Sequence, residues 1–354
     1  MRVSWSYSAS SSQWLLSTVG EGGRVLPRFV AVVAAVLCAA VLLLLALAWL
    51  LPDEAAYRAA VGIERWRAGL EVSSTEVAGQ PVPFLEGGRG EPLVLLHGFT
   101  GDKDNWTRVA ARLTGEFRVI APDLPGFGES RWDPARPLSA YAVPAQAEWL
   151  RDFLDGLGIR RAWLGGNSMG GNVVAAFAAK YPERVAGLWL LAPLGVPGAP
   201  PSEMDELIAA GRSVPLLPDT PEGMADRLSF VFSDPPWLPS GLKRYLGQQV
   251  VDRRDRYLAI RGQIRVIGDR GYPIPASPIP EFPARRGFGV LIVWGDADRV
   301  LAPAGAALLA QRIPGATVVI LSNVGHLPMV EQPARAAREL LRFRAAGSAA
   351  GAAP

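Results

Sequence analysis

A glycine-rich turn places one serine where it could act as a nucleophile. The hexapeptide GNSMGG at residues 166–171 follows a short apolar run and precedes a stretch with helical periodicity. A serine in such a G-x-S-x-G turn, between a buried strand and a helix, sits on strained backbone with its hydroxyl exposed above the sheet. Gly166 and Gly170 leave room for the turn, since side chains there would clash. The pattern predicts that Ser168 is a nucleophile and that the Met169 N–H, at the start of the helix, points toward an oxyanion.

The chain has two histidines, and one of them must be the base, because a serine hydroxyl is a weak nucleophile until its proton is removed. His326 follows an apolar run at 317–321, and its place after the serine and after the last expected strand suits the base role. His97 lies in the turn HGFTG, which presents backbone N–H groups. Gly98 and Phe99 are therefore expected to shape the oxyanion site, with the Phe99 N–H as its second donor. We interpret His97 as a structural residue that stiffens this turn; a direct acid–base role is the alternative.

A carboxylate must complete the set, because the base needs a partner that fixes its tautomer and stabilises its imidazolium form. The apolar run at 290–294 leads into GDADRV, which contains Asp296 and Asp298. We assign Asp298 to this role, while Asp296, beside a glycine, is typical of a turn residue. Asp123, in DLPGFGES, is interpreted as part of a hydrogen-bonded loop that supports the oxyanion turn and not as a nucleophile.

Alternating apolar runs and helical stretches must position these residues. The runs are apolar throughout, which is typical of strands in a parallel sheet covered on both faces. They lie at 93–96, 118–121, 162–164, 188–191, 290–294 and 317–321. Helical periodicity occurs at 106–113, 146–157, 171–180, 303–312 and 334–343. The alternation predicts an open, doubly wound and mostly parallel α/β sheet over residues 71–347. Residues 195–286, rich in proline and without a convincing buried strand, are expected to form a cap at one edge of the sheet.

A continuous apolar segment lies near the N-terminus. Residues 29–51 contain no charge, and a helix of this length, at about 1.5 Å rise per residue, can cross the ~30 Å hydrocarbon core of a bilayer. We expect a single transmembrane helix here, with a cleaved signal peptide as the alternative. Arg24 and Arg28 before the segment, and negative charges directly after it, favour a cytoplasmic N-terminus. This orientation predicts a catalytic domain exported across a bacterial inner membrane.

Residues 52–70 are expected to form an amphipathic helix beside the membrane. Tyr57, Val61 and Trp66 are predicted to share its apolar face, with arginines such as Arg65 directed toward headgroups or water. A plain connecting helix is the alternative.

The composition excludes several classes of protein. Of the 354 residues 49% are hydrophobic, so the chain can bury a large core, and only residues 1–28 and 348–354 are expected to be flexible. One cysteine excludes a disulfide framework, and one cysteine with two histidines does not favour a metal site. The net charge is only +3 and no basic stripe is present, which argues against nucleic-acid binding. No cofactor is expected.

Five segments together resemble those of the α/β-hydrolase family. They are LLHGFTG, APDLPGFGES, GGNSMGG, VWGDADRV and NVGHLPMVEQP, in that order. Within the family the chain resembles membrane-bound monoacylglycerol lipases and bacterial lipases, in HGFTGDKDNW, GNSMGGNVVAAFAAKYPERV and VPLLPDTPEGM. The resemblance implies the α/β-hydrolase fold and hydrolysis of acylglycerols at a membrane by Ser168, Asp298 and His326, with Phe99 and Met169 at the oxyanion positions. The stretch GYPIPASPIPEFP departs from the pattern of these lipases.

The sequence therefore predicts a membrane-anchored serine ester hydrolase that forms an acyl-enzyme with a lipid or other apolar ester. A C–C bond hydrolase of ring-cleavage products, which would use the same triad, and a non-catalytic binding protein are the alternatives. The apolar cap segments argue against the first, and the complete triad argues against the second.

Overall fold

The computed structural model describes residues 30–36, 38–39, 52–269, 271–282 and 288–350. The chain divides into two compact units, Met1–Ala56 and Tyr57–Pro354. In the first unit, residues 30–36 and 38–39 are helical; the tail predicted at 1–28 and the rest of the predicted transmembrane segment lie outside the described residues. No helix in the described part of the chain is both long and apolar enough to span a bilayer.

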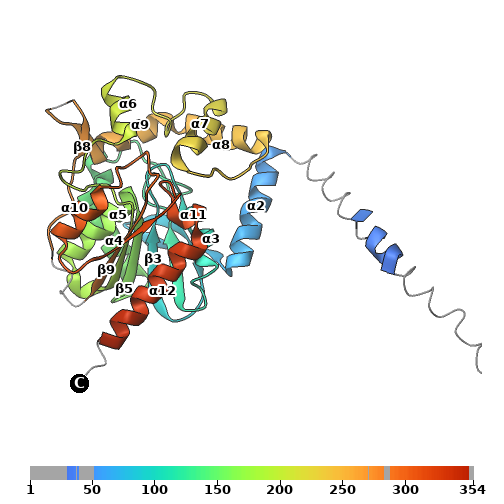
Figure 1. Cartoon of the computed structure of the whole chain (residues 1–354), viewed down its shortest axis with the longest axis horizontal. Helices are drawn as coiled ribbons and strands as arrows, with labels where there is room; N and C mark the ends of the chain where they lie inside the picture. Colours follow the sequence, from blue (N-terminus) through green and yellow to red (C-terminus); the bar gives the residue numbers. More distant parts are fainter. Residues whose placement is uncertain (1–29, 37, 40–51, 270, 283–287, 351–354) are drawn as a thin grey trace, which may run out of the picture. The chain divides into compact units, whose positions relative to one another are not determined.

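An eight-stranded sheet forms the centre of the larger unit (Figure 1). Its order is β1-β2-β4-β3-β5-β6-β9-β10, and every neighbouring pair from β4 to β10 is parallel. The parallel strands are β3 (Glu91–Leu96), β4 (Phe117–Pro122), β5 (Ala162–Asn167), β6 (Val185–Leu191), β9 (Gly289–Gly295) and β10 (Thr317–Leu321). The predicted mostly parallel, doubly wound sheet is confirmed, and each of these strands includes an apolar run expected from the sequence.

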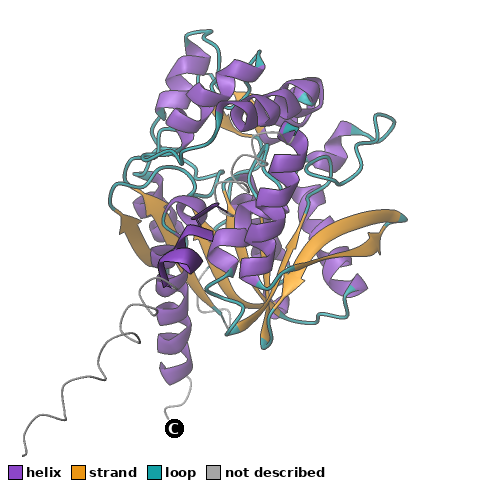
Figure 2. Cartoon of the chain, turned by 90° about the vertical axis from the view of Figure 1, so that its right-hand side faces the viewer, coloured by secondary structure: helices purple, strands orange, loops and turns teal. Residues whose placement is uncertain are grey.

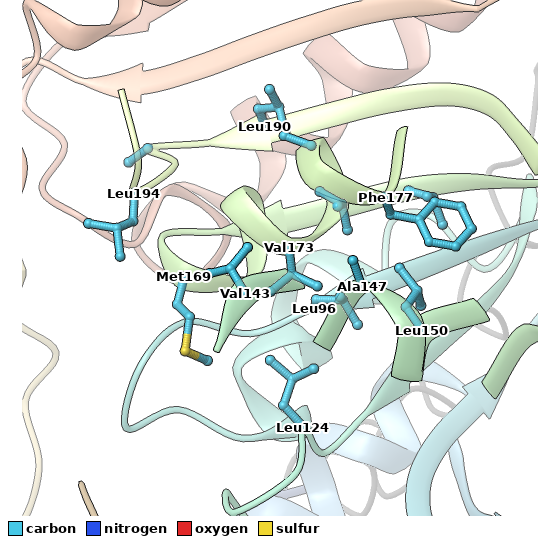
Figure 3. Packing of buried hydrophobic residues seen from close by; sticks show 14 of the residues in the cluster. Leu96, Leu124, Val143, Ala147, Leu150, Met169, Val173, Phe177, Leu190 and Leu194 are labelled. Carbon is cyan, nitrogen blue, oxygen red and sulfur yellow. The ribbon is translucent and has the colours of Figure 1, made fainter. Parts of the chain in front are cut away.

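Helices cover both faces of this sheet. Val94 and Leu96 of β3 belong to one apolar cluster with α4, α5 and α10, whereas Leu93 and Leu95 belong to a second cluster with α3 and α12. The alternation follows from the strand geometry, in which successive side chains point to opposite faces. Figure 3 shows the part of the first cluster between α4 and α5. The helices named are α3 (Thr107–Ala110), α4 (Val143–Gly156), α5 (Met169–Lys180), α10 (Gly305–Arg312) and α12 (Pro333–Ala350).

Two antiparallel strands were not predicted. β1 (Glu71–Val77) and β2 (Gln80–Gly87) form a hairpin, and β2 pairs antiparallel with β4. The sequence of β1 is EVSSTEV, in which only Val77 is buried. A half-exposed edge strand of this kind carries no continuous apolar run, so the pattern that predicts the parallel strands does not reveal it.

Most of the remaining elements come from the segment predicted as a cap. In Figures 1 and 2 they lie together at one end of the sheet. The Met204 N–H donates to the Arg299 carbonyl at 3.1 Å, and the His326 N–H donates to the Val231 carbonyl at 2.8 Å. These bonds join the cap to the loops that follow β9 and β10, so it covers the carboxyl ends of the parallel strands, where ligands of such sheets bind. The cap elements are α6 (Glu203–Ala209), α7 (Met224–Val231), α8 (Ser240–Asp252), α9 (Arg254–Ile264), β7 (Arg265–Ile267) and β8 (Pro273–Pro275).

Helix α2 (Asp53–Ala68) lies within the range expected for an amphipathic helix, but its arginine packs differently. Arg65 was predicted to face headgroups or water. Instead its Nε and Nη2 donate to the two carboxylate oxygens of Asp104, each at 2.7 Å. A planar guanidinium and a carboxylate form such a two-bond pair readily, and here it fastens α2 to the loop after β3.

The predicted apolar face of α2 is also wrong. Trp66 is 78% exposed, whereas Tyr57 and Val61 line a cavity. Residues of an α-helix are separated by about 100° of rotation, so Trp66, nine positions after Tyr57, lies on the opposite side of the helix.

Close packing of α5 against β3 generates a first prediction. A Cβ at Gly170 would overlap the carbonyl oxygens of Leu96 and His97. We expect Gly170→Ala to lower the free energy of unfolding by at least about 1–3 kcal/mol, the typical cost of overpacking. Gly262→Ala in α9, where nothing lies within 4 Å of the added methyl, should be neutral or slightly stabilising. Urea unfolding followed by circular dichroism measures both variants, and equal stabilities would contradict the packing.

Candidate active site

Ser168 has a strained backbone conformation at the junction of β5 and α5. Its φ of 53° and ψ of −117° lie outside the regions that L-residues favour. The Ser168 N–H donates to the Leu191 carbonyl at 3.1 Å, and the Ser168 carbonyl accepts from the Leu194 N–H at 2.9 Å. The turn is tight, because a Cβ at Gly166 would overlap the Gly170 carbonyl. Bonds on both sides of the residue thus hold the Ser168 side chain in the walls of two cavities beneath the cap.

The two neighbours of Ser168 in the chain also contribute to the site. Met169 is the first residue of α5, and the N–H of a first helical residue has no partner within its own helix. Asn167 donates its Nδ2 to the carbonyls of Leu191 and His326, both at 3.1 Å. The sequence analysis did not assign a role to Asn167, although its amide side chain stands between the glycine and the serine of the turn. Through these two bonds Asn167 links the serine turn to the histidine loop.

His326 lies in the loop after β10 and forms a pair with Asp298. Its Nδ1 is 2.8 Å from Asp298 Oδ2. A carboxylate only accepts hydrogen bonds, so Nδ1 carries the proton, and Nε2 of the neutral ring is left as an acceptor. Both side chains are buried, and His326 lines the same cavity as Ser168. The fold thus brings the predicted base and the predicted nucleophile to one cavity.

Three more hydrogen bonds fix the Asp298 carboxylate. Its Oδ1 accepts from the Val300 and Leu301 N–H groups at 2.8 and 3.0 Å, and its Oδ2 accepts from Trp294 Nε1 at 3.1 Å. A carboxylate held by several donors cannot rotate away from its histidine partner, so the ring orientation is fixed as well.

Asp296, the other carboxylate considered for this role, points elsewhere. It is exposed, and its Oδ1 accepts from the Asn323 N–H at 2.7 Å. Asp296 therefore joins the loop after β9 to the loop after β10, and it forms no hydrogen bond with His326 in the part of the chain that the structure describes.

The oxyanion loop after β3 is oriented by a buried histidine. His97 Nε2 lies 3.0 Å from the Leu124 N–H and accepts from it, so its Nδ1 carries the proton and donates to the Gly98 carbonyl at 2.8 Å. Burial lowers the pKa of His97, which keeps the ring neutral. The Gly98 carbonyl also accepts from the Gly101 N–H at 3.1 Å. Because the carbonyl and the following N–H of a trans peptide point in opposite directions, these bonds turn the Phe99 N–H outward from the loop.

Asp123 supports this loop from behind. Its Oδ1 accepts from the Lys103 N–H, and its Oδ2 accepts from Lys103 Nζ and from the Glu129 N–H, each at 2.8 Å. Burial works against the charge of Lys103, but the charge of Asp123 and its hydrogen bond outweigh burial and raise the pKa of Lys103. The Asp123 carboxylate is fully buried among these donors, in agreement with the supporting role inferred from the sequence.

Two cavities lie beneath the cap, and Phe99 and Ser168 line both of them. The first, the apolar cavity, has a volume of about 220 Å³ and a mainly aliphatic wall. The second, the mixed cavity, has a volume of about 300 Å³ and contains His326 together with polar and charged groups. The wall of the apolar cavity includes Leu194, Met204, Ile208, Leu258, Ile264 and Leu301. The wall of the mixed cavity includes Tyr57, Thr100, Asp102, Asp104, Arg227 and Arg253.

A strained serine after a parallel strand, a buried histidine–aspartate pair and outward-facing N–H groups beside two shared cavities define a serine-type hydrolase site on an α/β sheet. The sequence pattern of the alpha/beta hydrolase fold family matches residues 91–333, and the chain belongs to this family.

Several similar proteins are lipases. Lipase 3 of Moraxella sp. (strain TA144) is 36% identical over 79% of this chain and 87% of its own length. Human monoacylglycerol lipase ABHD6 is 28% identical over 79% of this chain and 84% of its own. Among solved structures, a membrane phospholipase A described as a bacterial virulence factor is 37% identical, with a TM-score of 0.74 over 90% of this chain and 98% of that one. The family and the lipase relatives show that the chain is an ester hydrolase.

Asp102, in the wall of the mixed cavity, has a strongly shifted pKa. Its Oδ1 accepts from the Asp104 N–H at 2.9 Å and caps a short 3-10 helix. Burial raises the pKa of Asp102 to about 7, the charges of Asp104 and Asp123 add to this effect, and Lys103 opposes it. The folded protein therefore binds the Asp102 proton more tightly than the unfolded chain does.

This shift predicts a pH-dependent stability. The unfolded chain releases the Asp102 proton first, so the wild-type protein loses stability as the pH rises from the ordinary carboxyl range to about 7. An asparagine retains the acceptor for Asp104 and does not titrate. We expect Asp102→Asn to raise the thermal unfolding midpoint above that of the wild type at pH 8, and by much less at pH 4.5. A difference that does not change with pH would contradict the shift.

Proposed function

We propose that this ester hydrolase uses Ser168 as its nucleophile, His326 as its general base and Asp298 as the carboxylate that orients the base. The observation that carries the proposal is the 2.8 Å hydrogen bond between His326 Nδ1 and Asp298, which selects the tautomer whose Nε2 accepts a proton, in a residue that lines the cavity shared with Ser168. An imidazole in this tautomer is the base that a serine hydroxyl needs.

The reaction then proceeds in two half-reactions. Ser168 Oγ attacks the ester carbonyl while its proton passes to His326 Nε2, and the N–H groups of Phe99 and Met169 bind the oxyanion. When the tetrahedral intermediate collapses, the alcohol leaves with the proton from His326, and the acyl group stays on Ser168. Water next attacks this acyl-enzyme, with His326 again as base, and the acid is released. Asp298 stabilises the imidazolium in both steps.

The two cavities support a division of the substrate between them. The aliphatic wall of the apolar cavity suits a medium or long acyl chain, because burial of each methylene contributes about 0.8 kcal/mol. The mixed cavity, with its hydrogen-bonding groups, suits the alcohol that leaves. A monoacylglycerol or a similar acylglycerol lipid has both parts. The relatives named for action on monoacylglycerol and phospholipid support a lipid ester as the substrate.

We further propose that residues 29–51 anchor the enzyme in the membrane that contains its substrate. The segment is uncharged over its whole length, and the charges that flank it favour a catalytic domain exported across a bacterial inner membrane. A related solved structure is that of a membrane phospholipase A, which supports a membrane location for this chain.

Two aspartates of one loop offer a matched test of the catalytic roles. We expect Asp298→Asn to lower kcat for a p-nitrophenyl ester by about 10⁴-fold, because asparagine leaves the histidine in the wrong tautomer. Asp296→Asn, two residues away, should retain nearly full activity. Ser168→Ala should abolish turnover while the circular dichroism spectrum stays native. Residual activity of Ser168→Ala, or the opposite order of the two aspartate variants, would overturn the assignments.

A truncated chain tests the anchor. A protein that begins at Asp53 retains α2 and its Arg65–Asp104 pair, so we expect unchanged turnover of short, water-soluble esters. Its rate on long-chain monoacylglycerol in bilayer vesicles should fall by about tenfold or more, because anchoring raises the effective concentration of enzyme beside its substrate. Equal rates of the full-length and truncated proteins on vesicles would contradict the proposed anchor.

A further inference from the structure

Helix α7 of the cap contacts the loops that carry the proposed base and acid. The Val231 carbonyl accepts from the His326 N–H at 2.8 Å. Arg299, in the loop after β9, donates to the Ser229 carbonyl at 3.2 Å, and its guanidinium lies over the Phe230 ring at 4.5 Å from the centroid. The end of α7 is therefore joined to both loops.

A third contact joins α7 to the oxyanion loop. Arg227 Nη2 donates to Thr100 Oγ1 at 2.9 Å, and Arg227 Nη1 donates to the Leu216 carbonyl at 3.0 Å. The Thr100 hydroxyl in turn donates to the Phe99 carbonyl at 2.6 Å. This chain of bonds runs from the cap to the residue whose N–H is the proposed oxyanion donor.

The oxyanion loop needs such support, because its backbone is strained. Thr100 has a φ of 62°, a conformation that β-branched residues seldom adopt and that persists only where neighbouring groups hold it. Arg227 reaches this loop with its side chain, while the Val231 carbonyl at the end of the same helix accepts from the histidine loop. Helix α7 thus contacts the oxyanion loop and the histidine loop together.

We propose that Arg227 is a positioning residue for ester hydrolysis, which acts through Thr100 to hold the Phe99 N–H in the orientation that binds the oxyanion. The inference rests on the proposed function, since it takes the Phe99 N–H as an oxyanion donor. The cap is then part of the catalytic scaffold as well as the wall of the acyl cavity. The oxyanion loop is correctly arranged only while α7 is in place.

Substitutions at both ends of the Arg227–Thr100 bond test this role. Loss of one oxyanion donor typically costs about 10²–10³ in kcat, and a residue that only orients the donor should cost less, about 10–10²-fold. We expect Arg227→Gln and Thr100→Val to lower kcat for p-nitrophenyl butyrate by this factor with little change in KM. Thr100→Ser, which retains the hydroxyl, should be close to wild type, and Arg227→Lys should recover part of the loss. Arg212→Gln, an exposed cap arginine outside both cavity walls, is the control and should keep full activity.

Two readouts separate positioning from a general structural effect. The Arg227→Gln/Thr100→Val double variant should be no slower than the slower single variant, because both changes break the same chain of bonds. A trifluoromethyl ketone, which forms an oxyanion on the serine, should bind more weakly to each variant by the factor lost in kcat/KM.

The inference is overturned by a rise in KM with unchanged kcat, by additive losses in the double variant, or by wild-type turnover of Thr100→Val. If Arg227→Gln does not fold, the comparison of Thr100→Val with Thr100→Ser decides. Thr100→Val replaces only the hydroxyl by a methyl group, and Thr100→Ser retains the hydroxyl. Ser168→Ala keeps the two proposals distinct. Activity in that variant would refute the proposed nucleophile, whereas an inactive Ser168→Ala beside a fully active Arg227→Gln would refute the positioning role alone.

Discussion

Ser168 keeps a positive φ because the structure around it prevents the turn from relaxing. Such a residue costs on the order of 1–3 kcal/mol, which the surrounding packing must offset. The glycines at 166 and 170 let the backbones of β5, α5 and β3 approach, and the carbonyl of the last residue of β6 and an N–H just after it bond to the serine on both sides. The turn can therefore persist only inside a sheet covered on both faces. The two apolar clusters meet this requirement, because the alternate residues of each parallel strand anchor helices on opposite sides.

The rest of the site is arranged around this turn by bonds between loops. Asn167 donates to the His326 carbonyl, His326 bonds to Asp298, and α7 of the cap contacts the loops that carry His326 and Asp298. On the other side, the buried Asp123–Lys103 pair and the neutral His97 hold the oxyanion loop. Because Asp123 and Lys103 behind the loop are bonded to each other, the loop rests on a paired charge and not on a free one.

The parallel strands were predictable, because each is a continuous apolar run that ends at a change of residue type. The same property explains the omission of β1, whose exposed residues interrupt any such run, whereas the short apolar run of β2 contains Pro83, and a proline within a run argues against a strand. Helix α2 shows a different limit. Its helical range followed from the sequence, but the Arg65–Asp104 pair joins residues that are 39 positions apart, and helical periodicity carries no information about such a partner.

By itself the sequence determined the fold class, the family and the short set of residues that could do chemistry, because these depend on local patterns: apolar runs, a glycine-flanked serine and two histidines. Only the tertiary structure decided which aspartate contacts the histidine. Asp296 and Asp298 belong to one loop, but the backbone turns Asp298 inward, where the Trp294 indole and two N–H groups hold it against His326, and turns Asp296 outward to Asn323. The same holds for Arg227, one of many arginines in the sequence. Its hydrogen bond to Thr100 joins residues that are 127 positions apart, and the sequence does not show that the fold brings them together.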